Sequence, residues 1–126
     1  MTRKVLIVDD SKLARMAVAK TLSALHPDWQ RLEAANADEA LARITADSPD
    51  IVLLDFNMPG KNGLVFAAEL RQLSPSISVA VISANHQAEV IKRAHEAGAT
   101  FLAKPLTEKA LSDYLNTALP ERRASS

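Results

Sequence analysis

Short runs of branched apolar residues alternate along the chain with longer segments whose apolar residues recur at helical spacing. The runs predict strands at residues 5–8, 30–35, 51–55, 79–83 and 100–103. The longer segments predict helices at residues 11–25, 36–47, 63–73, 87–97 and 107–119. The second strand is the most polar and is expected at an edge, whereas the first, third and fourth are apolar almost throughout. This pattern is typical of a doubly wound α/β fold, in which helices cover both faces of a parallel sheet.

Polar residues at the expected helix ends support this division. Ser11, Asn36 and Thr107 are suited to cap the first, second and fifth helices. Glu39 stands at capping-box spacing from Asn36. Gly98 is suited to the turn just past the fourth helix.

The composition is that of an ordinary globular domain. The 126 residues include 15 basic and 15 acidic side chains, so no net charge favours nucleic acid or an anionic membrane. Cysteine is absent, which excludes disulfides, thiolate metal sites and a catalytic thiol. The first apolar run is too short for a signal peptide or a membrane span, so a cytoplasmic protein is expected. Residues 1–120 are expected to form one domain and residues 121–126 a polar tail.

Three aspartates follow two of the inner strands. Asp9 and Asp10 end the first strand, and Asp55 ends the third, shortly before a Pro-Gly pair that forces a loop. The carboxyl ends of strands are where open α/β sheets place their chemistry. If the two strands are neighbours, the carboxylates converge and raise one another's pKa unless a cation neutralises them. A set of oxygen ligands selects a hard cation, Mg²⁺ first, although each acid taken singly is explained as a solvated strand-end residue.

Two further polar residues stand at the carboxyl ends of the fourth and fifth strands. Lys104 ends the fifth strand and Ser83 ends the fourth. A lysine beside acids can balance their charge or bind a phosphoryl oxygen, and a hydroxyl can donate to an anion. With these partners, Asp55 can attack a phosphoryl group and form an acyl phosphate. Taken singly, Lys104 is better explained as a surface lysine and Ser83 as a turn or capping residue.

Missing motifs argue against several other functions. No G-x-G-x-x-G follows a strand, so dinucleotide binding is unsupported, and the absence of G-x-x-x-x-G-K-[ST] excludes a P-loop NTPase. Asn57 stands where D-x-D phosphatases carry a second aspartate, which argues against a turnover phosphatase. The sequence also shows no pattern that pairs a histidine, serine or cysteine nucleophile with a base.

The combined motifs resemble the receiver domain of two-component response regulators. The matching residues, in chain order, are Asp9-Asp10, Asp55 with Met58-Pro59 and Gly63, Ser83-Ala84, and Lys104-Pro105. The resemblance covers about residues 4–119 and implies a flavodoxin-like sheet of strand order 2-1-3-4-5. It also implies a signalling switch, not an enzyme that turns over an external substrate.

The resemblance implies roles for single residues. Asp55 would accept the phosphoryl group of a phosphohistidine. Asp10, Asp55 and the backbone carbonyl of Asn57 would bind Mg²⁺ directly, with Asp9 acting through water. Lys104 would pair with the phosphoryl group.

A conformational switch is implied by the same resemblance. Ser83 would move to bond a phosphoryl oxygen, Phe101 would turn inward as it moves, and the peptide bond before Pro105 would be cis. The chain departs from the commonest pattern at Phe56, where a smaller aliphatic residue is usual, and at Leu106, where phenylalanine is frequent. Phe101 itself replaces a frequent tyrosine and so lacks a hydroxyl for bonding at a partner surface.

Two regions are candidate partner surfaces. Leu13, Met16 and Ala17 lie off the apolar stripe of the first helix, near the acids, where a sensor histidine kinase or a histidine phosphotransfer protein would dock. The region that the family uses for output or dimerisation includes Ile91, Phe101, Ala110 and Tyr114. Taken singly, each of these residues is better explained by core packing or by scattered surface exposure.

The sequence therefore favours a receiver that cycles an aspartyl phosphate at Asp55 and signals through a protein partner, without direct contact to nucleic acid or membrane. Two alternatives remain open. One is a phosphorylation-independent interaction module of the same fold, disfavoured by the intact acids, Ser83 and Lys104. The other is a small Mg²⁺-dependent phosphohydrolase, disfavoured by the missing D-x-D.

Overall fold

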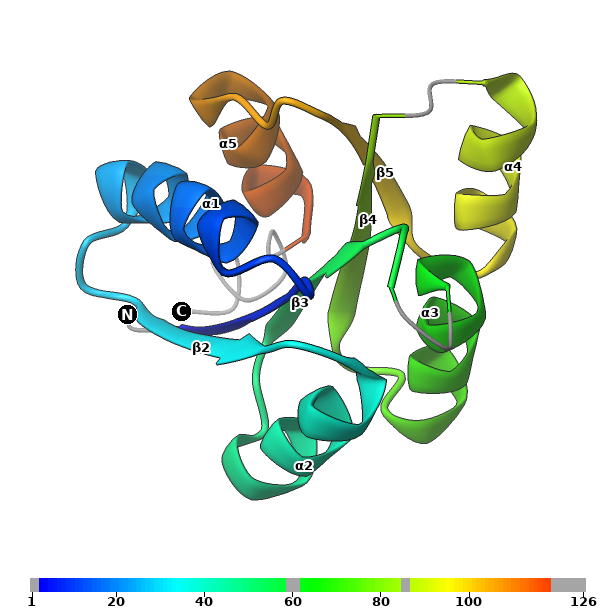
Figure 1. The fold of residues 1–126 in the computed structure, drawn as a ribbon, viewed down its shortest axis with the longest axis horizontal. Coiled ribbons are helices and arrows are strands. Elements are labelled where there is room, and N and C mark those ends of the chain that lie inside the picture. Colours follow the sequence, from blue (N-terminus) through cyan, green and yellow to red (C-terminus); the bar gives the residue numbers. More distant parts are fainter. Residues whose placement is uncertain (1–2, 59–61, 85–86, 119–126) are drawn as a thin grey trace.

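Strands and helices alternate along residues 3–58, 62–84 and 87–118, which the computed structural model describes (Figure 1). The strands are β1 (Lys4–Val8), β2 (Gln30–Ala34), β3 (Ile51–Asp55), β4 (Ser78–Ser83) and β5 (Thr100–Ala103). The helices are α1 (Lys12–Leu25), α2 (Ala37–Asp47), α3 (Gly63–Leu73), α4 (Ala88–Glu96) and α5 (Glu108–Ala118). The predicted boundaries agree with these to within one residue wherever both ends are described. The loop predicted at residues 59–60, the last helix's end at residue 119 and the tail at 121–126 lie outside the described residues.

The strands form one parallel sheet in the order β2-β1-β3-β4-β5. This confirms the doubly wound fold, the strand order and the edge position of β2. Helices α1 and α5 cover one face of the sheet, and α2, α3 and α4 cover the other (Figure 1). Because β3 is central and β1 is its neighbour, the segments that follow these two strands emerge side by side.

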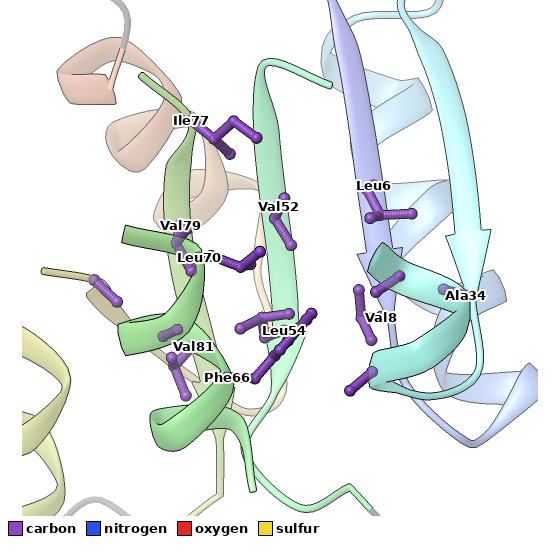
Figure 2. Packing of buried hydrophobic residues seen from close by; sticks show 14 of the residues in the cluster. Leu6, Val8, Ala34, Val52, Leu54, Phe66, Leu70, Ile77, Val79 and Val81 are labelled. Atoms are coloured by element: carbon purple, nitrogen blue, oxygen red, sulfur yellow. The ribbon is translucent and has the colours of Figure 1, made fainter. Parts of the chain in front are cut away.

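Successive residues of the inner strands point to opposite faces, so the sheet has two cores. The core below α2 and α3 takes Leu6, Val8, Val52 and Leu54 from the sheet, packed against Phe66 and Leu70 of α3 (Figure 2). The core below α1 and α5 takes Val5, Ile7, Ile51 and Leu53, packed against Leu22 and Leu111. All of these side chains are at most 1% exposed, and each contributes about 1.5–3 kcal/mol by burial. Packing on both faces therefore holds the inner strands, and the residues at their ends, in a fixed frame.

The expected helix caps are confirmed. The side-chain oxygens of Ser11, Asn36 and Thr107 each accept the backbone N–H three residues later, at 3.2, 2.9 and 3.1 Å respectively. Glu39 closes its capping box one residue early, since its carboxylate accepts the N–H of Ala35 at 2.9 Å instead of that of Asn36. Gly98, at φ 81°, adopts the left-handed conformation just past α4, as predicted.

The strand register brings four strand ends to one edge of the sheet. Val8 pairs with Leu54, so Asp9 lies level with Asp55 on the neighbouring strand. Ser83 pairs with Ala103, so the residue after β5 lies beside the end of β4. Within the described ranges, none of the helices has the length and apolarity that crossing a membrane requires.

Candidate functional site

Three carboxylates meet at the carboxyl edge of the sheet. One oxygen atom each from Asp9, Asp10 and Asp55 lies within 4.8 Å of the other two. Asp9 and Asp55 are each only 6% exposed, whereas Asp10 is open to solvent. The predicted convergence of these acids is therefore observed.

Asp9 shows what this crowding does to a carboxylate. Burial is the main cause that raises the pKa of Asp9 above its ordinary value of 3.8, and the negative charges of Asp55 and Asp10 raise it further. The N–H of Ser11, which donates to Asp9 Oδ1 at 2.9 Å, and the charge of Lys104 act in the opposite direction without cancelling the rise. The cluster therefore fits a bound cation, and its set of oxygen donors fits Mg²⁺.

Lys104 supplies the positive charge of the site. Its Nζ donates to Asp55 Oδ1 at 2.8 Å, with 38% of the lysine side chain and 7% of the aspartate side chain exposed. The Lys104 N–H donates to the carbonyl of Ser83 at 3.0 Å, which fixes the lysine backbone against the end of β4. The peptide bond from Lys104 to Pro105 is cis, as the resemblance implied.

The remaining predicted site residues lie on β4 and β5 or shortly after β3. Ser83, at the end of β4, is 2% exposed. Phe101 lies on β5, is half-buried and pairs in register with Val81, two residues before Ser83. Asn57 is exposed, two residues after the end of β3. The structure thus brings Asp9, Asp10, Asp55, Ser83 and Lys104 to one edge.

Gly63 has a role that the sequence did not reveal. A Cβ atom at this position would lie 2.6 Å from the carbonyl oxygen of Asp55 and 3.0 Å from the Cα of Phe56. The Gly63 N–H donates to the carbonyl of Phe56 at 2.8 Å. The missing side chain therefore lets α3 begin directly against the segment that carries Asp55. Asn62 caps this helix, because its side-chain oxygen accepts the N–H of Val65 at 2.9 Å. An asparagine just before an apolar stretch is the sequence signal that could have predicted this cap.

An apolar groove of about 440 Å³ borders the site between α1 and the segment after β5. Its polar end is formed by Asp9 and Lys104. Its apolar walls include Ala14, Ala17, Val18, Ile82, Pro105 and Leu106. Ala17 was predicted as part of a partner surface, whereas the contribution of Leu106 to the groove was not predicted.

The predicted partner-surface residues differ in exposure. Leu13 is 78% and Met16 53% exposed on α1, and Ala17 is also exposed. Ile91 and Ala110 are half-buried.

Tyr114 was predicted to belong to the output surface, but its side chain is not exposed. It is buried in the core below α1 and α5, with its hydroxyl 2.6 Å from Ser78 Oγ. The reason is helical spacing, because Tyr114 shares the buried face of α5 with Leu111 and Leu115.

The chain is similar to known proteins in family, in sequence and in structure. The family model described as "Response regulator receiver domain" matches residues 5–116. The chain is 31% identical over 121 residues to sporulation initiation phosphotransferase F of Bacillus subtilis, covering 95% of this chain and 96% of that protein. It is 32% identical over 117 residues to chemotaxis protein CheY of Thermotoga maritima, covering 92% and 97%. Other curated relatives are about twice as long, and the chain spans 46–53% of their length.

A solved structure agrees with these matches. The chemotaxis response regulator CheY4 of Vibrio cholerae superposes with a TM-score of 0.82 at 29% identity, over 94% of this chain and all of that one. The shared fold therefore extends over almost the whole length.

Proposed function

The chain belongs to the response regulator receiver domain family of two-component signalling, and from this premise we propose that Asp55 accepts a phosphoryl group from a phosphohistidine. One observation carries the proposal. The Asp55 carboxylate, at the end of the central strand, lies 2.8 Å from Lys104 Nζ and within 4.8 Å of two further carboxylates. A candidate nucleophile, a positively charged lysine and two candidate metal ligands are thus grouped around one buried carboxylate.

The family resemblance suggests which residues would hold the metal. Asp10 and Asp55 would hold Mg²⁺ directly together with the backbone carbonyl of Asn57, and Asp9 would act through water. When bound, the ion supplies positive charge that stabilises the transferring phosphoryl group. Asp9 and Asp10 contribute the negative charge that draws the cation to this edge.

The transfer itself needs only Asp55 and its lysine from this chain. An oxygen of Asp55 attacks the phosphorus atom, the bond from phosphorus to the histidine nitrogen breaks, and an acyl phosphate forms. Lys104 orients the carboxylate before transfer and then pairs with an oxygen of the phosphoryl group as a point charge. The buried position of Asp55 excludes most solvent from the reacting oxygen.

The response to phosphorylation would pass along β4 and β5. Ser83 would bond a phosphoryl oxygen, and Phe101, two register positions back on the neighbouring strand, would turn inward as Ser83 moves. Pro105 follows Lys104 directly and is part of the same proposed switch segment. The surface formed by α4, β5 and α5, with Ile91 among its residues, would then change its affinity for a downstream protein.

The phosphodonor would dock over α1. Leu13 and Met16 present apolar side chains there, and the groove along Ala17 leads to Lys104 and Asp9. A sensor histidine kinase or a histidine phosphotransfer protein would bring its phosphohistidine to Asp55 by this route. The proposal includes a cytoplasmic location, shared with such donors, and no turnover of an external substrate.

The test is chemical phosphorylation followed by intact mass measurement. Purified protein with Mg²⁺ and a small phosphodonor such as acetyl phosphate should gain the mass of one phosphoryl group, stable in acid and lost in base. Asp55→Asn should abolish the gain, whereas the control Asp28→Asn, in the exposed turn after α1, should retain it. An unmodified wild-type mass would contradict the proposal and favour a phosphorylation-independent module, and rapid hydrolysis of unrelated phosphate esters would favour a phosphohydrolase.

A further inference from the structure

Arg15, in α1, joins the first helix, the edge strand and the acid cluster. Its Nη1 donates to the backbone carbonyl of Asp9 at 2.7 Å, and its Nε donates to Glu33 Oε1 on β2 at 2.8 Å. Only 15% of the arginine side chain is exposed, compared with 46% for that of Glu33. Neither residue belongs to the set that the sequence motifs identify.

The carbonyl that Arg15 holds belongs to the peptide unit between Asp9 and Asp10. Because this unit is planar, a donor fixed on its oxygen sets the orientation of the whole plane, and with it the direction in which Asp10 leaves the backbone. The other contacts of this segment act on Asp9, whose N–H donates to the carbonyl of Ala34 at 3.1 Å and whose Oδ1 accepts the N–H of Ser11 at 2.9 Å. Arg15 therefore completes the support on the side that faces Asp10.

Glu33 in turn sets the direction of the guanidinium. An arginine side chain is flexible, but its guanidinium is a rigid plane whose N–H groups diverge at fixed angles. When the carboxylate of Glu33 holds Nε, the same plane directs Nη1 at the carbonyl of Asp9. Glu33 pairs in register with Ile7 of β1, so its backbone is itself fixed beside the end of that strand.

We propose that Arg15 is a positioning residue for cation binding, held by Glu33, which fixes the Asp9–Asp10 peptide so that Asp10 presents its carboxylate to Mg²⁺. The inference rests on the proposed function, because it assigns the support of the same metal ligands. Arg15 contacts the ligand backbone and none of the reacting atoms. Its loss should therefore weaken cation binding and leave the phosphoryl-transfer step itself intact.

The test compares Mg²⁺ affinity in four proteins by isothermal titration calorimetry. Arg15→Ala should raise the Kd for Mg²⁺ on the order of tenfold, as for other groups that orient metal ligands. Glu33→Ala should raise it less, since the guanidinium then keeps its donor but loses its orientation. The control Lys12→Ala removes an exposed positive charge from the same turn of α1 and should leave the Kd within about twofold of wild type.

Two further readouts separate positioning from a general structural role. The rate of phosphorylation by acetyl phosphate should fall in Arg15→Ala at low Mg²⁺ and recover to near the wild-type rate when Mg²⁺ saturates. Urea unfolding in EDTA reports the stability of the fold without the cation, and variants that unfold at the same urea concentration as wild type yet bind Mg²⁺ more weakly would support the proposal.

Three results would overturn it. An unchanged Kd in both Arg15→Ala and Glu33→Ala, an equal loss in Lys12→Ala, or a rate that stays low at saturating Mg²⁺ would each remove the positioning role. If the wild-type protein binds Mg²⁺ and is phosphorylated while Arg15→Ala behaves identically, this inference alone fails. If the wild-type protein does neither, the proposed function fails with it.

Discussion

Replacing Asp9 with asparagine should stabilise the metal-free protein. The substitution removes one charge from the cluster and keeps an Oδ1 that accepts the N–H of Ser11. Two unit charges 4.8 Å apart repel by about 3.5 kcal/mol at an effective dielectric constant of about 20. The attraction of Lys104, which also acts on Asp9, offsets part of this repulsion. We therefore expect the free energy of unfolding of Asp9→Asn to exceed that of wild type by about 1–2 kcal/mol at neutral pH.

The pH dependence of this difference follows from the raised pKa of Asp9. Because the folded state holds the proton more tightly than the unfolded state, wild type loses stability as the pH rises from 3.8 through the raised pKa. Asp9→Asn does not undergo this loss, so its advantage should vanish below pH 3.8 and be fully present above the raised pKa.

Urea unfolding followed by circular dichroism checks the prediction in EDTA and in excess Mg²⁺. Bound Mg²⁺ stabilises wild type by about 2.7 kcal/mol at a concentration of 100 Kd, and stabilises a variant with fewer ligand charges less. The advantage of Asp9→Asn should therefore shrink or reverse in Mg²⁺, whereas Asp28→Asn, in an exposed turn, should change stability little in either buffer. If Asp9→Asn is less stable than wild type in EDTA, or if Mg²⁺ does not alter its advantage, charge repulsion does not govern the stability of this cluster.

Other substitutions test separate parts of the account. Lys104→Gln leaves the buried carboxylate of Asp55 without its positively charged partner. Because the lysine is partly solvated, we expect the free energy of unfolding in urea to fall by about 1–2 kcal/mol. Phosphorylation by acetyl phosphate should become at least about tenfold slower. Gly63→Ala places a Cβ against backbone atoms that cannot rotate away, so it should cost about 1–3 kcal/mol and slow phosphorylation; wild-type values for both would contradict the close approach. Tyr114→Phe removes a hydroxyl whose pKa is raised from 10.0 to about 12 by burial. The neutral hydroxyl is favoured in the fold, so wild type should lose up to about 2.7 kcal/mol relative to the variant between pH 10 and 12, measured by urea unfolding. At neutral pH the variant should instead be less stable by about 1 kcal/mol, having lost the bond to Ser78.

The sequence predicted the elements well because their signals are local. Uninterrupted apolar runs identified the buried strands, and Ser11, Asn36 and Thr107 identified helix starts. The convergence of Asp9, Asp10 and Asp55 was predicted from strand ends, on the condition that β1 and β3 are neighbours. Local patterns do not determine that pairing, so the strand order depended on the resemblance to receiver domains.

Contacts between segments that are distant along the chain could not be predicted from the sequence. The bond from Arg15 to Glu33 requires the register of β1 with β2, and the approach of Gly63 to Asp55 brings the start of α3 against the end of β3. Tyr114 was misplaced because an apolar residue on a helix does not by itself reveal which neighbours cover it. In this structure its ring packs in the core between α5 and the sheet, and its hydroxyl forms a hydrogen bond with Ser78.

The acceptor role of Asp55 is tested most directly by locating the phosphoryl group. Protein treated with Mg²⁺ and acetyl phosphate is reduced with borohydride, which converts an acyl phosphate to an alcohol, and its peptides are then sequenced by mass spectrometry. We predict homoserine at position 55 in place of aspartate, and no conversion at Asp9 or Asp10. Conversion at either of those residues with Asp55 unchanged, or no conversion in a protein that binds Mg²⁺, would contradict it.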